Sequence, residues 1–396
     1  MIESIKLQNF LSFGNDCSEI ELQSLNVIIG TNGSGKTNFL EAFDLLQNAP
    51  SDISKPIREG GGVSNWLHKG NKDNNNAVLE FVAKNKLPGP FNAFRYIISF
   101  NAITQKFELF DERIESCKHC NDDTKPFVLY NFNEGRNPVV SARMYPDHEH
   151  IYTLEQTGVD PAQSILSQKR DSVFYPEITF LANEFNKIRL YREWSFGRYN
   201  PPRLPQKVDL KNDYLESDCS NLCMVLNQIR NDIITKKRLL QELKYFYADV
   251  EDYEVTFAGG QAQIFFQEYG LKSSVPATRL SDGTLRYLCL LSILCHPTPP
   301  PLICIEEPEL GMHPDVIPNL AKLLHEASER CQLIVTTHSE ILIDAFTETP
   351  SVVIVAEKKD NGTRLERLDE ITLKPWLEKY RLGNLWSRGD IGGTRW

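Results

Sequence analysis

The stretch Gly30-Thr31-Asn32-Gly33-Ser34-Gly35-Lys36-Thr37 stands between an apolar run and a segment with apolar residues at helical spacing. The run Leu25–Ile29 is apolar on both faces, which is typical of a buried parallel strand. The helical spacing continues over residues 37–47. The stretch is therefore predicted to connect a strand to a helix. In that place its glycines let the loop curl, so that backbone N–H groups point at phosphate oxygens beside the positive end of the helix.

This loop predicts a site for a nucleotide triphosphate and its metal ion. Lys36 would neutralise the β and γ phosphates, and the Thr37 hydroxyl would hold Mg²⁺. The residues expected to bind ATP here are Asn32, Gly33, Ser34, Gly35, Lys36 and Thr37. A glycine-rich turn with an exposed lysine is the alternative. The complete eight-residue pattern between a strand and a helix disfavours it.

Two further apolar runs carry polar residues at their ends. Leu302–Ile305 is followed by Glu306 and Glu307, and residues 333–336 are followed by His338. Ligands gather at the carboxyl ends of strands in open α/β sheets. We expect Glu306 to contact the magnesium shell, Glu307 to act as general base toward the attacking water, and His338 to sense the γ phosphate. A solvated strand end and a structural histidine are the alternatives, and the order of the motifs favours the site.

The loop Leu280-Ser281-Asp282-Gly283-Thr284 precedes another predicted helix. Ser281 and the N–H groups near Gly283 would form a second anion site. The first loop already encloses the phosphates of its own nucleotide, so we expect this one to meet the γ phosphate bound by a second copy of the chain. A serine that caps a helix explains the pentapeptide alone about as well. Its position between the phosphate loop and the carboxylate strand favours a shared site, and hence a homodimer or a larger homo-oligomer.

Alternating strand and helix patterns in the last third predict an α/β fold with an open, largely parallel sheet flanked by helices. Strand patterns separated by polar loops between residues 50 and 165 predict an antiparallel layer. Residues 209–247 lack proline and glycine and show helical spacing, which predicts a helical insertion. The expected division is an N-terminal lobe (residues 1–207), a helical insertion or lid (208–250) and a C-terminal lobe (251–396).

The composition is that of a globular protein, with 41% hydrophobic and 24% charged residues among 396. A formal charge of −10 excludes a surface that is basic overall, although a local basic groove remains compatible with it. The nine cysteines, several inside apolar runs, favour buried thiols in a reducing compartment. There is no run of about 18 apolar residues and no signal-peptide pattern. We therefore expect a cytoplasmic protein without a membrane partner.

Together with residues 311–315, these motifs occur in an order that resembles ABC-type ATPase heads of the SMC, RecF and OLD group, where they are named Walker A, signature, Walker B, D-loop and H-loop. Glu306-Glu307-Pro308-Glu309, followed by Met312-His313-Pro314, is particularly similar to bacterial OLD-like and RecF-like ATPases. The resemblance implies an ABC-type P-loop fold in which ATP is sandwiched between two subunits. Each subunit would give Lys36 and Glu307 to one nucleotide and Ser281 to the other.

The chain also departs from these relatives. Asp282 stands where transporters have glycine, and His313 lies where a D-loop aspartate is expected. The sequence shows no sustained heptad pattern, so the long arms of SMC proteins are not expected. The residues after His338 are too few for the TOPRIM nuclease domain of OLD proteins. The glutamine of a lid loop has no clear place, and Gln168 is a guess for it.

Some features allow two interpretations. Four arginines interleave with aromatic residues between Lys187 and Lys207, and they could contact DNA through phosphates and stacked bases; the arginines are Arg189, Arg192, Arg198 and Arg203. The alternative interpretation, slightly favoured over DNA contact, is that the aromatics belong to the core and the arginines pair with acidic residues. Cys117 and Cys120 have the close spacing of a zinc clip, with zinc the less favoured interpretation. Two tryptophans within residues 385–396 suggest that this segment docks on the head or on a partner.

The function expected from these features is a slow ATPase that hydrolyses ATP to ADP and phosphate with Mg²⁺. Its ATP-gated dimer would control a separately encoded effector, a nuclease, in bacterial anti-phage defence. The alternative is a DNA-binding ATPase of repair or recombination that resembles RecF and SMC proteins. A scaffold that binds ATP without hydrolysing it is the third possibility.

Overall fold

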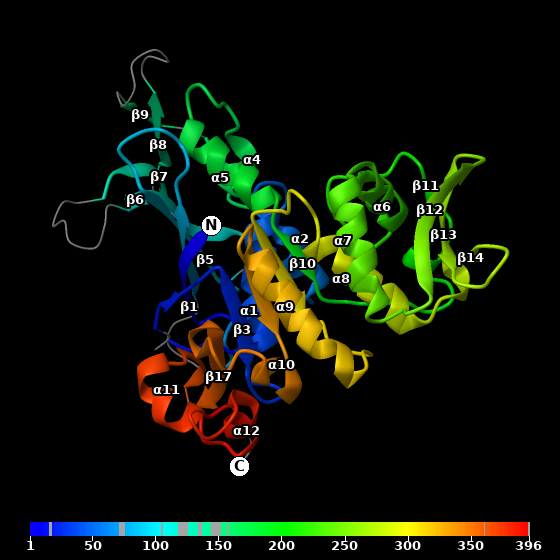
Figure 1. Ribbon diagram of the computed structural model, residues 1–396. Helices are drawn as coiled ribbons and strands as arrows, with labels where there is room; N and C mark the ends of the chain where they lie inside the picture. The colour runs from blue at the N-terminus through cyan, green and yellow to red at the C-terminus, as the bar shows by residue number, and fades with distance from the viewer. Residues whose placement is uncertain are drawn as a thin grey trace.

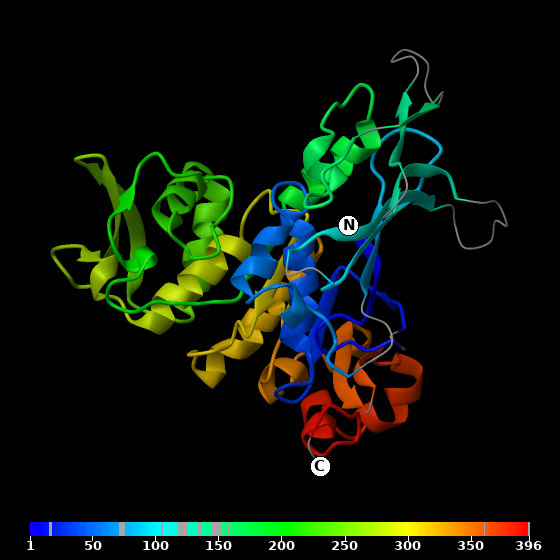
Figure 2. The same cartoon turned by 180° about the vertical axis from the view of Figure 1, so that it is seen from behind.

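The computed structural model describes residues 1–15, 18–70, 76–103, 106–117, 126–133, 137–143, 152–156, 158–359 and 361–394. Its strands form a six-stranded sheet, an eight-stranded sheet and a smaller four-stranded sheet. The six-stranded sheet is central, and the other two lie at opposite sides of it (Figures 1 and 2). No helix in this described part of the chain has the length and apolar character that crossing a bilayer requires.

The central sheet confirms the predicted parallel arrangement. In spatial order it contains β10 (Arg189–Tyr191), β15 (Leu302–Glu306), β16 (Gln332–Thr336), β3 (Leu25–Ile29), β17 (Val353–Lys359) and β18 (Gly362–Arg367). All neighbours run parallel except β17 and β18, which form an antiparallel hairpin. Because β16 lies between β3 and β15, the carboxyl ends of these three strands are adjacent.

Alternate residues of the central strands belong to two different cores. Val27 and Ile29 of β3 lie in one core, and Ile28 lies in the other. Ile303 and Cys304 of β15 divide in the same way. Successive side chains of a strand point to opposite faces, so both faces of this sheet are covered. That explains why these runs are apolar throughout.

Helices cover both faces of the central sheet (Figure 1). α8 (Asp282–Leu294) and α9 (Ile317–Ser328) share the core of Val27, whereas α1 (Lys36–Asn48) and α5 (Pro176–Asn186) share that of Ile28. The other helices near this sheet are α2 (Ser54–Glu59), α3 (Val63–Trp66), α4 (Ile165–Gln168), α10 (Glu340–Asp344), α11 (Glu370–Leu377) and α12 (Leu382–Ser387). Short 3-10 turns are η1 (Pro201–Arg203), η2 (Ala277–Arg279), η3 (Pro314–Val316) and η4 (Pro350–Val352).

The eight-stranded sheet is the predicted antiparallel layer, and every pair of neighbours in it is antiparallel. In spatial order it contains β2 (Ile20–Glu21), β1 (Ile2–Gln8), β4 (Ala77–Lys84), β5 (Ala93–Phe100), β6 (Leu109–Cys117), β7 (Val128–Asn133), β8 (Val139–Arg143) and β9 (Tyr152–Gln156). β1, at the start of the chain, pairs with β4, which follows the phosphate loop in the sequence. The layer packs on the face of the central sheet that carries α1.

The predicted helical insertion is two helices, α6 (Leu222–Asn231) and α7 (Ile233–Lys244), not one continuous segment. Asp232 ends the first helix and caps the second, because its carboxylate accepts hydrogen bonds from the N–H groups of Ile234 and Thr235. The helices pack on a sheet of β11 (Gln206–Lys207), β13 (Gln261–Glu268), β12 (Val250–Ala258) and β14 (Val275–Pro276). The expected boundaries at 207/208 and 250/251 therefore fall inside one packed unit.

A buried carboxylate connects the eight-stranded sheet to α4. Glu112 of β6 accepts hydrogen bonds from the hydroxyl groups of Tyr96 (2.8 Å) and Ser164 (2.5 Å) and from the N–H of Ile165 (2.9 Å). Burial raises the pKa of Glu112 to about 7, although these donors act in the opposite direction. The folded protein therefore holds this proton at pH values where the unfolded chain has released it.

We predict that Glu112 makes the free energy of unfolding fall as the pH rises from about 4.5 to about 7, by up to about 3 kcal/mol. The sign follows because the folded state binds more protons than the unfolded state in this window. Urea denaturation of the wild type and of Glu112→Gln at pH 5 and pH 8 measures the effect. The variant should lose that part of the pH dependence; an equal dependence in both proteins would contradict the prediction.

Candidate active site

The phosphate loop joins β3 to α1, as its sequence predicts. Gly30, Gly33 and Gly35 have φ angles of +150°, +77° and +104°, in the region that favours glycine. A Cβ atom on Gly35 would overlap the Thr363 side chain, and one on Gly30 would overlap the carbonyl oxygen of Ala356. The loop is thus pressed against the β17–β18 hairpin, whereas Gly33 faces open space.

The loop has the unmet polar groups that an anion site requires. The hydroxyl of Ser34 is buried and has no hydrogen-bond partner among the described residues. No side chain caps α1, whose N-cap is Gly35. The first N–H groups of a helix need acceptors, and the helix end favours negative charge. A phosphate group would satisfy both requirements, so the residues present fit the predicted ligand.

Among the residues that the structure describes, the hydrogen-bond partners of the Lys36 ammonium are neutral oxygens. It donates to the carbonyl oxygens of Gly30 (2.8 Å) and Thr31 (3.0 Å). Burial lowers the pKa of Lys36 to about 8, with Glu307 and Glu306 acting in the opposite direction. A buried cation of this kind is stabilised by an added anion, which agrees with its expected role at the phosphates.

Thr37 and Glu306, the two expected magnesium ligands, are brought together. The Thr37 hydroxyl donates a short hydrogen bond to one carboxylate oxygen of Glu306. Mg²⁺ takes oxygen ligands of these types and keeps several waters. The pair could therefore hold the ion at the end of β15, with the longer side chain of glutamate acting directly or through water.

Glu307 adopts an uncommon backbone conformation. Its φ is +45°, although it carries a side chain, and its N–H donates to the carbonyl oxygen of Thr336 (3.0 Å). Such residues cost of order 1–3 kcal/mol and cluster at functional sites. One Glu307 carboxylate oxygen lies 3.6 Å from Nε2 of His338. Burial lowers the pKa of His338, and Lys36 acts in the same direction. The predicted base and the predicted γ-phosphate sensor are therefore neighbours.

Glu309 is a residue of this site that the sequence analysis did not assign. Its carboxylate accepts hydrogen bonds from the Thr337 hydroxyl (2.5 Å) and from the N–H of His338 (3.1 Å). Burial raises its pKa. Glu309 thus fixes the loop after β16 from the loop that follows β15, which positions the histidine. The third glutamate of Glu306-Glu307-Pro308-Glu309 was the available sequence signal.

Arg192 and Trp194 agree with the interpretation of core aromatics and arginines paired with acids, and both also lie at the carboxylates. Arg192 Nε lies 3.3 Å from the second carboxylate oxygen of Glu306, and its Nη2 lies 2.8 Å from Glu41. The Trp194 indole N–H donates to the Glu306 carbonyl oxygen (3.3 Å). The guanidinium of Arg286 on α8 lies over the same indole ring and donates to the carbonyl oxygen of Glu307 (2.9 Å). Only the fold reveals these contacts.

Ser281 begins α8, as the capping alternative predicts. Its hydroxyl accepts the N–H of Thr284 (3.0 Å) and lies 2.7 Å from the Thr284 hydroxyl. A Cβ atom on Gly283 would lie 3.0 Å from the carbonyl oxygen of Gly311. The loop of residues 280–284 therefore packs against the loop that follows the carboxylate strand. A single chain leaves the contact of Ser281 with a second nucleotide as a prediction.

The structure gives a reason for Asp282 at the position where transporters have glycine. Its carboxylate receives a short hydrogen bond from Arg203, which is 7% exposed. Arg203 also donates to the carbonyl oxygens of Leu280 (2.5 Å) and Phe196 (3.1 Å). Removing either partner would leave a buried charge or several carbonyl groups without a partner. Arg203 thus holds the loop of Ser281 and is not available at the surface.

The other members of the basic and aromatic segment also have partners within the chain. Arg189 donates to the carbonyl oxygens of Asn186 and Ile188. Tyr191 and Phe196 are buried, in agreement with the core interpretation. Arg198 is exposed and lies over the ring of Tyr199, which is 80% exposed. Of the four arginines and these aromatics, Arg198 and Tyr199 are the members that could reach a nucleic acid.

Two predictions gain no support from the described residues. Cys117 ends β6, but Cys120 lies outside the described residues, so the zinc clip stays a prediction. Where the structure describes the chain, no group of three or more His, Cys, Asp or Glu residues could hold a metal ion. Gln168 ends α4, and its side-chain amide donates to the carbonyl oxygens of Asp160 (3.1 Å) and Gln163 (2.9 Å). It is held within its own loop.

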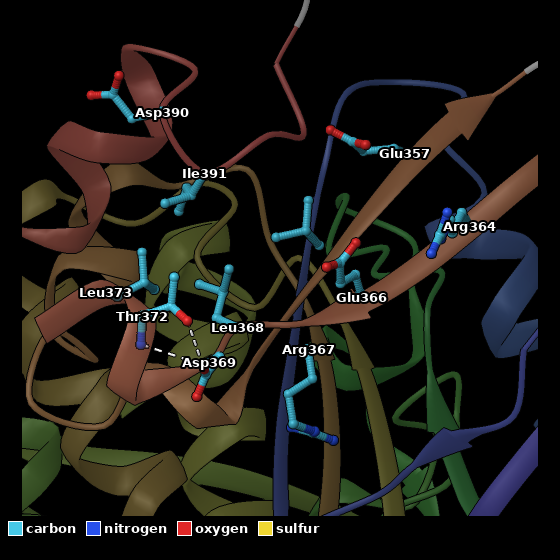
Figure 3. A pocket seen from close by; sticks show the side chains of 11 residues that line it. Glu357, Arg364, Glu366, Arg367, Leu368, Asp369, Thr372, Leu373, Asp390 and Ile391 are labelled. Atoms are coloured by element: carbon cyan, nitrogen blue, oxygen red, sulfur yellow. Dashed lines mark hydrogen bonds between the residues drawn. The ribbon is translucent and has the colours of Figure 1, made fainter.

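Two hollows lie beside the motif residues. A groove of about 680 Å³ includes Glu41, Arg192 and Asp44 among its lining residues, next to the Glu306 cluster. A second pocket of about 300 Å³ lies between the β17–β18 hairpin and α11, and Figure 3 shows its side chains, including Glu357 and Ile391. Neither is lined by residues of the phosphate loop.

Residues 25–344 match the protein family described as "AAA domain, putative AbiEii toxin, Type IV TA system". The chain belongs to this AAA-domain family. No curated protein matches the chain. The match spans more than half of the chain and includes all five motifs.

Solved structures confirm the fold. The chain is similar to an Smc head bound to the C-terminal winged-helix domain of ScpA, with 14% identity and a TM-score of 0.57 over 94% of this chain and 99% of that one. It is also similar to a Pyrococcus furiosus Smc head with an extended coiled coil bound to the C-terminal domain of ScpA, with 13% identity and a TM-score of 0.58 over 96% and 98%. This AAA-domain protein therefore has the ABC-type P-loop fold of SMC heads.

We predict that ATP affinity is nearly constant below pH 8 and weakens above it by up to about tenfold per pH unit. The reason is that the free protein loses the Lys36 proton near pH 8, whereas phosphate binds the charged form. Calorimetric titration with ATP in two buffers of different ionisation enthalpy should show proton uptake on binding at pH 9 and none at pH 7. Equal proton exchange at both pH values would contradict the assignment.

Proposed function

We propose that this protein is an ATPase that binds Mg²⁺-ATP at the phosphate loop and hydrolyses it as a dimer with shared sites. The observation that carries the proposal is the meeting of three strand ends. Thr37 bonds Glu306, and Glu307 lies beside His338, all next to a loop with a buried lysine. These are the parts that phosphoryl transfer to water needs: a cradle, oxygen ligands for a metal and a carboxylate base.

Each residue has a distinct task in this scheme. Lys36 and the N–H groups at the start of α1 bind and orient the phosphates. Glu307 accepts a proton from the attacking water, and the imidazole of His338, whose backbone N–H is held by Glu309, contacts the γ phosphate. Bound Mg²⁺ would neutralise charge on the phosphate oxygens. The strained backbone of Glu307 helps to hold the carboxylate in place.

The loop of Ser281 supports the dimer. It packs against Gly311 of the loop that follows the carboxylate strand, so the two loops lie side by side on the same protomer. Ser281 would bind the γ phosphate of the nucleotide held by the second copy. Ser281 of the second copy would in turn bind the γ phosphate of the nucleotide held by this protomer. ATP would then stabilise the dimer, and hydrolysis would release it.

We further propose that the ATP-gated dimer controls a separately encoded effector, a nuclease, in bacterial anti-phage defence. The family description, which names a toxin and a toxin–antitoxin system, supports the defence setting. A DNA-binding ATPase of repair or recombination is the second candidate, and the exposed pair Arg198 and Tyr199 is the feature that favours it.

Glu307→Gln should trap an ATP-bound dimer and slow turnover about a hundredfold or more, because the amide cannot accept the water proton. Lys36→Ala should abolish ATP binding and stay monomeric. Light scattering with saturating Mg²⁺-ATP and a phosphate-release assay measure both effects. Glu329→Gln, the same change at the exposed residue that directly follows α9, should behave as the wild type. A monomeric Glu307→Gln protein under these conditions would contradict the scheme.

One further experiment distinguishes control of an effector from DNA binding in repair or recombination. The protein is purified with the product of its neighbouring gene, and ATP-dependent association and nuclease activity are measured. The effector hypothesis predicts both; their absence would contradict it. ATP-stimulated, salt-sensitive binding of duplex DNA by the protein alone, lost in Arg198→Ala with Tyr199→Ala, would favour the DNA-binding alternative.

A further inference from the structure

Residues 389–394 form a tight turn, here called the glycine turn, which no motif explains. Gly389, Gly392 and Gly393 have φ angles of +81°, +79° and +71°. The turn is anchored at both sides. The N–H of Gly393 donates to Glu357 of β17 (2.9 Å), and its carbonyl oxygen accepts from the Trp386 indole (3.3 Å). The Gly393 N–H is the largest cause of a lowered pKa at Glu357.

The glycine turn touches the first residue of the phosphate loop. A Cβ atom on Gly393 would lie 3.4 Å from the Gly30 Cα atom and 3.0 Å from Val355 Cγ1. Gly30 is also confined by β17, because a Cβ atom there would overlap the Ala356 carbonyl. The start of the loop therefore contacts both β17 and the glycine turn. In Figure 3, Ile391 and Glu357 lie beside the pocket at this place.

The helix that precedes the glycine turn reaches the other end of the site. α12 packs against α10, the helix that directly follows His338 and Ser339. The N–H of Gly383 donates to Asp344 (2.7 Å), and a Cβ atom on Gly383 would lie 2.5 Å from the carbonyl oxygen of Glu340. Residues 382–394 thus contact both the element after the γ-phosphate sensor and the start of the phosphate loop.

We propose that the glycine turn is a positioning element of the nucleotide site, which holds Gly30 in the conformation that phosphate binding requires and ties it to α10. The inference rests on the proposed ATP-binding function. It assigns a role to residues that lie more than 350 positions from the phosphate loop along the chain. Glu357 and Trp386 act through the turn and do not touch the nucleotide.

The test compares Gly393→Ala with Gly260→Ala. Gly260 has a similar φ of +76°, but a Cβ atom there meets nothing within 4 Å. Both changes place alanine in a left-handed conformation, which lowers the melting temperature in each case. Only the methyl group of Gly393→Ala also meets close neighbours, Val355 Cγ1 at 3.0 Å and the Trp386 indole nitrogen at 3.3 Å, so only this change displaces the glycine turn from Gly30. It should weaken ATP binding about tenfold and raise KM, with kcat at saturating ATP changed by less than about twofold.

A second set of variants leaves the glycines of the turn unchanged. Glu357→Ala should raise the Kd for ATP, and Glu357→Gln should restore most of the affinity because its amide oxygen still accepts the Gly393 N–H. Glu366→Ala, on β18 beside the same pocket, should bind ATP as the wild type. ATP binding by Gly393→Ala and Glu357→Ala equal to that of Gly260→Ala and Glu366→Ala would overturn the inference.

The outcomes distinguish this inference from the proposed function. If the wild type fails to bind ATP in the same fluorescence assay with a labelled ATP analogue, the ATPase proposal fails first. If the wild type binds ATP, and Gly393→Ala and Glu357→Ala bind it as well as their controls, only the role of the glycine turn is refuted.

Discussion

The site depends on one constraint, the order of three parallel strands. β16 lies between β3 and β15, so the phosphate loop, the carboxylates and the histidine all emerge at one edge of the sheet. No local sequence feature brings them together, since about 270 residues separate Lys36 from Glu306. The two apolar cores on either side of the sheet keep this order, because each central strand contributes to both. The chemistry is therefore a consequence of the packing of the strands.

Charge at this edge is balanced within the protein. Lys36 is enclosed by carbonyl oxygens, Glu306 lies between the Thr37 hydroxyl and Arg192, and Glu307 lies beside His338. A nucleotide would enter a cluster in which each charge already has a neighbour of opposite charge or a dipole. Rearrangement of these pairs on binding is a physical route by which the γ phosphate could alter the loops that face a second copy.

The sequence predicted the local structure around the motifs, because each motif depends on a local pattern: an apolar strand, a glycine loop and a helix start. It could not predict Arg192 at Glu306 or Arg203 at Asp282, since these pairs join residues 114 and 79 positions apart. Interleaved arginines and aromatics left DNA contacts open beside the slightly favoured core interpretation, and the fold uses three of the four arginines internally. The predicted helical insertion left out β11, which precedes the helices in the chain and pairs with β13 after them, so this pairing appears only in three dimensions.

The central claim is that one protomer supplies Lys36 and its partner supplies Ser281 to the same nucleotide. Mixing two inactive variants, Lys36→Ala and Ser281→Arg, tests it most directly through phosphate release. A mixed dimer contains one intact site, so the account predicts phosphate release that neither variant shows alone, reaching about a quarter of wild-type activity where the protomers pair at random. No recovery, in a mixture whose ATP-bound mixed dimers are demonstrated by light scattering and crosslinking, would contradict the shared site.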